Sequence, residues 1–353
     1  MKHLYRISKE CFISFDGGNL YLPNDQKMTL EQSAWHRLLS KIHIVSRLLR
    51  LEPRCVELLN GYVLVVAYHK QIYCVDINKA TILKVLNLRQ GFSVPLNFLS
   101  NAGYVYWGDY GSNAHAEPVN IYRVGESLEP EVVYTFPANT VRHIHNILFD
   151  QHLQLYWILT GDIGAHSGIY TATADWSRVE PFLVGKQLYR AVMAFTCENG
   201  LVYATDAVDK ENYLIQLSYS DKTVKMLTSI NGSCIYGGEN KEAYFFSTTV
   251  EPKEKNGWSN MFSYELGEGI KNRNVHVIVV KKDLSAIRVI KCFKKDVWPM
   301  KLFQYGMVMF PKGQKTYADM WVYPMACKRT SKGTICITKD EISDELQKTE
   351  TLH

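Results

Sequence analysis

The segment from Val141 to Asp162, VRHIHNILFDQHLQLYWILTGD, contains the pattern that recurs along most of the chain. Two apolar runs flank the polar turn Asp150-Gln151-His152, as expected for a hairpin of two β-strands. The second run, LYWILTGD, is echoed by YVYWGD ending at Asp109 and by LVYATD ending at Asp206. From Leu51 onward, short strands alternate with turn signals about every ten residues. This spacing predicts an all-β chain.

The strands group into sets of four that repeat at intervals of roughly 45 residues, which is the period of a β-propeller blade. Six such sets follow residue 51. The strands near Phe12 to Phe15 and Asn19 to Leu22 close the last blade or form a further one. The sequence therefore predicts a β-propeller of six four-stranded blades, or seven if these strands complete another. We expect one domain over residues 1–340 and a charged tail over 341–353.

Residues 29–50 have a different periodicity. Apolar residues recur there at steps of three and four, which predicts one amphipathic helix inserted near the N-terminus. Thr29 and Gln32 are spaced as a capping box, and Arg37, Lys41 and Arg47 are expected on the solvent side. Packing against the outside of the propeller is the ordinary role of such an insertion. A protein partner bound through helix 29–50 is the alternative.

Composition excludes several classes of function. The 353 residues include 40 basic and 35 acidic side chains, and the resulting net charge of +5 is spread along the chain rather than gathered in a nucleic-acid-binding stripe. No apolar run has the length of a membrane span or a signal peptide. The eight cysteines form no CxxC pair, so we expect free thiols and a cytoplasmic location. Walker, GxGxxG, GxSxG and zinc-finger spacings are absent from the sequence.

A polar rim is predicted on one face of the propeller. In each blade the start of the innermost strand lies beside the end of the second strand, because the two strands are antiparallel. Side chains at these places should therefore converge near the central axis. The predicted catalytic residues are His143, His145, Asp162 and Asp206. The predicted substrate-binding residues are Arg142, Arg190, Tyr189, Asp109, Trp107 and Glu251.

This rim suits a hydroxylated and anionic ligand such as a sugar. Carboxylates could act as acid, base or nucleophile, a histidine could act as base near neutral pH, and the arginines could bind a carboxylate or sulfate. The alternative is that these residues have a purely structural role, as a hydrogen-bonded rim of turn residues. No cofactor is predicted; a divalent metal at His143 and His145 is the minority alternative.

The stretch GIYTATADWS, with Asp175 in a hairpin turn, and SFDGG, with Asp16, resemble the Asp-box turns of sialidase-like (BNR) bacterial β-propellers. The resemblance covers about residues 95 to 250. It implies a propeller that acts on glycans, with Arg142 and Arg190 as candidates for two of the family's three carboxylate-binding arginines and with no candidate for the third. Propeller-type polysaccharide lyases fit the rim about as well.

Together these features predict a carbohydrate-active propeller that binds a glycan at a polar funnel on one face. If the propeller also cleaves the glycan, we expect a glycoside hydrolase-like or lyase-like reaction. The alternative is a non-catalytic propeller that serves as a scaffold for protein or glycan binding. Polar convergence on the rim favours the first, and the inserted helix favours the second.

Overall fold

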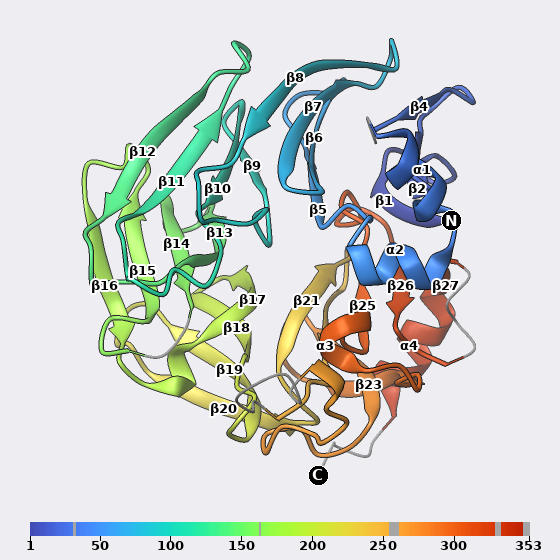
Figure 1. The fold of residues 1–353 in the computed structure, drawn as a ribbon. Coiled ribbons are helices and arrows are strands. Elements are labelled where there is room, and N and C mark those ends of the chain that lie inside the picture. Colours follow the sequence, from blue (N-terminus) through green and yellow to red (C-terminus); the bar gives the residue numbers. More distant parts are fainter. Residues whose placement is uncertain (31–32, 162–163, 254–260, 329–332, 349–353) are drawn as a thin grey trace.

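The computed structural model describes residues 1–30, 33–161, 164–253, 261–328 and 333–348, and it shows seven antiparallel sheets arranged around one axis (Figure 1). The predicted propeller is confirmed, in its seven-bladed form. The N-terminal strands complete a blade of their own rather than closing the last one. Six sheets have four strands and the seventh has three among the described residues.

The strands follow the chain in blade order. Blade 1 contains β1 (Lys2–Arg6), β2 (Phe12–Asp16), β3 (Asn19–Tyr21) and β4 (Lys27–Thr29), and blade 2 contains β5 (Cys55–Leu58), β6 (Val63–Tyr68), β7 (Gln71–Asp76) and β8 (Thr81–Asn87). Blade 3 contains β9 (Leu99–Asn101), β10 (Tyr104–Gly108), β11 (Val119–Val124) and β12 (Pro130–Phe136), and blade 4 contains β13 (Ile144–Asp150), β14 (Leu155–Thr160), β15 (Gly168–Thr173) and β16 (Val179–Val184). Blade 5 contains β17 (Ala191–Cys197), β18 (Gly200–Thr205), β19 (Asn212–Ser218) and β20 (Val224–Ile230), and blade 6 contains β21 (Cys234–Glu239), β22 (Ala243–Thr248), β23 (Asn274–Lys281) and β24 (Ile287–Lys294). Blade 7 contains β25 (Met307–Met309), β26 (Met320–Met325) and β27 (Ile335–Ile337).

The second strand of most blades is buried along its whole length, as in β6, β14, β18 and β22. These strands are covered on both faces because each sheet packs between two neighbouring blades. Six apolar clusters each join one blade to the next, from blades 1 and 2 through blades 6 and 7. Double-sided burial explains why the repeated motif reads as a continuous apolar run rather than as an alternation.

The contact between blades 7 and 1 closes the ring with polar and aromatic groups. The Arg6 guanidinium forms an ion pair with Asp319, with Nη1–Oδ1 at 2.7 Å, and lies 3.7 Å above the ring of Tyr317. Backbone hydrogen bonds join Arg6 to Lys312 and Lys312 to Leu4, as a single parallel bridge. Closure therefore uses no strand shared between the two sheets.

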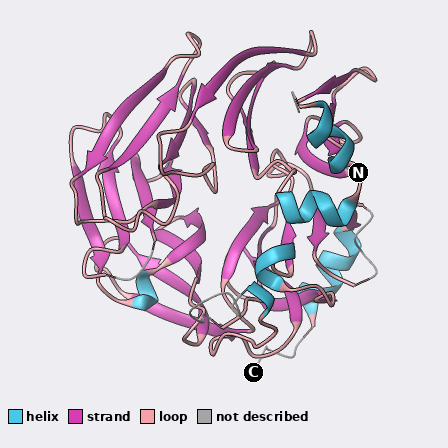
Figure 2. Cartoon of the chain, viewed as in Figure 1, coloured by secondary structure: helices cyan, strands magenta, loops and turns pink. Residues whose placement is uncertain are grey.

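Because strands alternate in direction within each blade, every connection from one blade to the next lies on the same face. We call it the helical face, since it carries α1 (Ala34–Ser40), α2 (His43–Leu49), α3 (Met300–Phe303) and the turn η1 (Gln187–Tyr189), which all occupy such connections (Figure 2). The innermost strand of each blade begins on this face and the second strand ends there.

The prediction of one helix over residues 29–50 is wrong in its details. Thr29 belongs to β4, and the first helix is capped by Ser33, whose side chain accepts a hydrogen bond from the His36 amide. The extended backbone of Ile42, with φ −94° and ψ 101°, separates α1 from α2. Arg47, expected in solvent, is buried because it forms an ion pair with Asp296 at 2.6 Å.

Part of the expected C-terminal tail is an ordered helix, α4 (Lys339–Gln347). Thr338 and Glu341 form a capping box, and Ile342 is buried in the cluster that joins blades 6 and 7. The helix packs against β23 and β24. The apolar residue and the cap within the charged segment account for this difference from the prediction.

Candidate functional site

The candidate site lies at the central axis on the helical face. His143 and His145 come from the start of β13 and Arg190 from the start of β17, whereas Asp206 and Glu251 follow the ends of β18 and β22. The expected convergence is therefore found for these five side chains, drawn from blades 4, 5 and 6. Asp162 lies outside the described residues.

The two imidazoles are buried and face each other, with Nε2 to Nε2 at 3.0 Å. Their Nδ1 atoms lie 2.7 Å from the Gly111 carbonyl oxygen for His143 and 2.8 Å from the Ala191 carbonyl oxygen for His145. Each of these three contacts needs one ring proton, since carbonyl oxygens only accept and two nitrogen lone pairs repel. Two neutral imidazoles carry only two protons. The pair therefore needs a third proton, or a cation in its place.

Burial, followed by the charges of His143 and Arg190, lowers the pKa of His145 well below its ordinary value. Gly161 makes the close approach of the pair feasible, because a Cβ atom there would overlap the Nε2 atoms of both rings. Among the described residues, no group of three ligating side chains accompanies the pair as a metal site would require.

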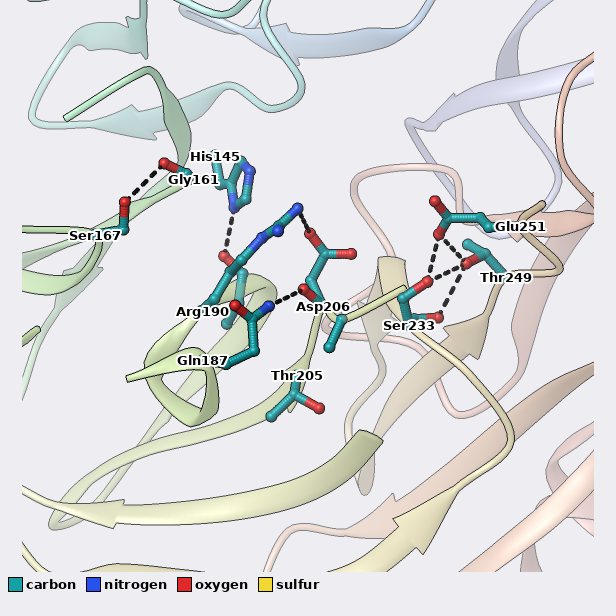
Figure 3. Close-up of polar contacts among 12 residues, drawn as sticks. His145, Gly161, Ser167, Gln187, Arg190, Thr205, Asp206, Ser233, Thr249 and Glu251 are labelled. Carbon is teal, nitrogen blue, oxygen red and sulfur yellow. Dashed lines mark hydrogen bonds and ion pairs between the residues drawn. The ribbon is translucent and has the colours of Figure 1, made fainter. Parts of the chain in front are cut away.

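Arg190 and Asp206 point toward each other across the axis side of blade 5 (Figure 3), with Nη2 to Oδ2 at 3.1 Å. The Asp206 amide donates to the Arg190 carbonyl, and the Gln187 side chain donates to the Asp206 carbonyl at 3.2 Å. These backbone hydrogen bonds position Asp206, in addition to the ion pair of its carboxylate with Arg190. Arg190 is therefore engaged within the protein.

Glu251 lies on the blade 6 side of the same site (Figure 3) and accepts hydrogen bonds from the hydroxyls of Ser233 and Thr249. Burial, followed by the negative charge of Asp206, raises the pKa of Glu251 to about 7. The two hydroxyls oppose this rise but do not cancel it. A carboxyl group with this pKa can donate or accept a proton near neutral pH.

Two arginines that the sequence analysis did not select complete the site. Arg54 precedes β5, lies 4.8 Å from the Tyr110 ring centroid and donates to the Val94 carbonyl at 3.1 Å. Burial, followed by the neighbouring Arg54 charge, lowers the pKa of Arg50, while Tyr305, Tyr236 and Tyr110 oppose this effect. Among the described residues, neither arginine forms an ion pair with a carboxylate. Arg54 stands directly before its innermost strand, as Arg190 does before β17, and that matched position could have identified it.

The cluster connects around the axis through Tyr110. Its ring centroid lies 4.8 Å from that of His143, 6.5 Å from that of His145 and 4.8 Å from the Arg54 guanidinium carbon. A small cavity of about 50 Å³ beside Arg54 is lined also by Lys2, Tyr236 and Phe310. That volume accommodates one or two water molecules or a small anionic group.

Other predicted site residues lie elsewhere. Asp109 forms an ion pair with Arg89 at 3.2 Å and lines, with Trp107, a separate cavity of about 190 Å³ between blades 2 and 3. Arg142 donates to the carbonyls of Asn113 and Ala114 and so holds that loop. The Tyr189 ring lies in η1 beneath the Lys186 ammonium, at 5.7 Å. Arg142 and Tyr189 adjoin the axial cluster only through their chain neighbours His143 and Arg190.

No family model and no curated protein sequence matches the chain. Among solved structures, the WD40 β-propeller domain of Doa1 is similar at a TM-score of 0.53 and 10% identity, over 92% of this chain and 90% of that one. An oligogalacturonate lyase in complex with manganese gives a TM-score of 0.46 at 7% identity over 77% and 75%, and Kuenenia stuttgartiensis hydrazine synthase gives 0.45 at 12% over 84% and 82%. Likeness at such identities shows the fold alone.

The fold and the site together define the class: a seven-bladed β-propeller with an axial cluster of arginine, tyrosine, histidine and carboxyl groups. Within the described residues, no helix combines the length and apolar character needed to cross a bilayer.

Proposed function

We propose that the propeller binds an anionic, hydroxylated ligand of the acidic saccharide class at the axial site. The observation that carries this proposal is the pair Arg50 and Arg54, two neighbouring cations without a carboxylate partner among the described residues. A carboxylate or sulfate placed between them would relieve their repulsion and accept charge-assisted hydrogen bonds. Tyr110, Tyr236 and Tyr305 supply ring faces and hydroxyls suited to a sugar.

The resemblance to sialidase-like propellers belongs to this proposal. It is supported by Asp175, which closes the turn between β15 and β16 by accepting hydrogen bonds from Thr173 and Ser177. Asp16 is instead the last residue of β2 and pairs with Asn19 of β3, in the middle hairpin of blade 1. The proposal rests on the arginine pair rather than on these turns.

Bond cleavage would fall to Glu251, whose carboxyl exchanges a proton near neutrality and lies beside Asp206. The histidine pair is less suited to act as base, since both Nδ1 atoms contact carbonyls and the Nε2 atoms contact each other. Binding is therefore proposed as the primary activity, and cleavage as its catalytic extension.

The test is calorimetric titration with galacturonate oligomers, sialyllactose and sulfated disaccharides, with neutral oligosaccharides as the comparison. We expect binding of an acidic ligand only, and a loss of about tenfold or more for Arg54→Gln, the scale of one charge-assisted contact. Arg178→Gln, in an exposed outer hairpin, is the matched control. Equal binding by Arg54→Gln, or no acidic ligand bound by the folded protein, would refute the proposal. A reducing-end assay on the same ligands, with Glu251→Gln, separates cleavage from binding.

A non-catalytic scaffold that binds protein through the helical face is the second candidate. It is favoured by the exposed apolar side chains of α1 and α2, among them Trp35 and Leu38. Binding of a protein partner that survives Arg54→Gln would support this candidate.

A further inference from the structure

The helical face carries an apolar patch beside the axial site, formed by side chains of α1, α2 and the loop before α3. Its members are Trp35, Leu38, Ile42, Leu48, Leu49, Val297 and Trp298. Trp35 is 66% exposed and Val297 is 65% exposed, so apolar groups from both α1 and the loop before α3 reach solvent. Exposed apolar side chains gathered in one region indicate an interaction surface.

The parts of the patch are held together as one unit. Arg47 of α2 forms an ion pair with Asp296 at 2.6 Å and donates to the Phe303 carbonyl at 3.0 Å. The Trp298 ring lies 5.2 Å from the Phe303 ring, and α1 and α2 contact each other. The loop before α3 is thereby fixed against α2.

The two helices are oriented opposite to the usual arrangement of an amphipathic helix. Leu38, Leu49 and the intervening Ile42 face solvent, although apolar helix residues normally face a protein core, whereas Leu39, Ile44 and Val45 are only half-buried. Ser40, Ser46 and Arg47 are the side chains buried against the propeller. The ion pair and hydrogen bond of Arg47 help to hold α2 in place, and much of the apolar surface of the two helices is left for another surface.

The charge around the patch has one sign. Residues 33–51 contain four arginines or lysines and no aspartate or glutamate. Asp296 neutralises Arg47, while Arg37 and Lys41 reach solvent. Exposed tryptophan and leucine side chains flanked by cations are typical of helices that lie in the interface of an anionic membrane.

We propose that α1 and α2, with the loop before α3, dock the propeller onto an anionic phospholipid surface. The apolar patch enters the headgroup region and Arg37 and Lys41 contact the lipid phosphates. This inference is independent of the ligand proposed for the axial site. A second copy of the chain fits less well, because a two-fold contact through the same patch would bring like charges together.

The experiment is co-sedimentation of the full chain with phosphatidylcholine vesicles, with and without phosphatidylserine, together with tryptophan emission. We expect binding that requires phosphatidylserine, weakens with salt and shifts the emission to the blue. W35A/L38A/I42A should abolish binding, and R37Q/K41Q should weaken it by about tenfold or more, at about 1 kcal/mol for each cation. V132A/M226A is the control, since both residues are exposed and apolar on the outer strands β12 and β20.

Several results would overturn the proposal. They are no vesicle binding by the folded protein, equal binding with and without phosphatidylserine, or unchanged binding by W35A/L38A/I42A. If the wild type fails to bind vesicles but forms a dimer that this variant loses, the patch is a contact between copies and the membrane proposal is wrong. Unchanged melting temperatures of the variants ensure that lost binding reports on the surface.

Discussion

Replacing Glu251 with glutamine should remove a pH-dependent part of the protein's stability. The folded protein holds the Glu251 carboxyl with a pKa of about 7, against an ordinary value of 4.5, chiefly because the group is buried and secondly because Asp206 is near. The folded state therefore binds this proton more tightly than the unfolded state does. The resulting stabilisation is complete below pH 4.5 and is lost as the pH rises through about 7.

The magnitude follows from the two pKa values. At about 1.36 kcal/mol per unit of pKa, the difference between pKa values of 4.5 and about 7 corresponds to about 3 kcal/mol of stability. For a chain of 353 residues this equals a change in melting temperature of about 4 °C. Glutamine resembles the protonated carboxyl, since its carbonyl oxygen can still accept from Ser233 and Thr249, and it has no proton to lose.

The assay is differential scanning fluorimetry of the wild type and Glu251→Gln between pH 4.5 and 8. Taking the difference between the two proteins cancels the titration of all other groups. The wild type should lose about 4 °C relative to the variant over this range, whereas Glu180→Gln, at an exposed site, should follow the wild type. A difference that stays constant with pH would show that Glu251 ionises as an ordinary carboxyl and would refute the reasoning.

Three further outcomes are expected. Gly161→Ala should lower the free energy of unfolding by about 2 kcal/mol or more through overlap with both imidazoles, while Gly61→Ala, which meets no atom within 4 Å, should be neutral in urea unfolding. Arg47→Ala should lower it by about 2 kcal/mol because the Phe303 carbonyl loses its donor and Asp296 keeps only Lys295 as an ion-pair partner, and a value equal to that of exposed Arg37→Ala would contradict this account. Without reductant, alkylation should modify all eight cysteines of the denatured protein and chiefly the exposed Cys292 of the native one; a pair that resists alkylation after denaturation would indicate a disulfide.

The blade repeat could be predicted because second strands are covered on both sides, which leaves a continuous apolar signature at β6, β14, β18 and β22. The orientation of the inserted helices could not be predicted from the sequence. A period of 3.6 residues shows that a stripe exists but not whether it faces the protein, and here the ion pair of Arg47 decides the orientation. The break at Ile42 is likewise not marked by a glycine or a proline in the sequence.

At the site, matched positions correctly brought together His143, His145, Arg190, Asp206 and Glu251. Asp109 was misplaced by strand register: its amide donates to Asn120 of the third strand, whereas the Asp206 amide donates to Arg190 before the innermost strand. A difference of this kind turns a side chain to the other face of its sheet. Sequence alone does not fix such a register.

The polar closure of the ring bears on how the chain emerges from the ribosome. Blade 1 is built from consecutive N-terminal residues, so it can form long before blade 7 is synthesised. Its side toward blade 7 presents the cation of Arg6 beside the ring of Phe12, and this cation can remain hydrated while the rest of the propeller is made. An edge that waited as an unpaired apolar strand would invite pairing with other nascent chains. The contact between blades 7 and 1, which forms last, is thus the one whose blade 1 surface is best suited to remain in contact with water until then.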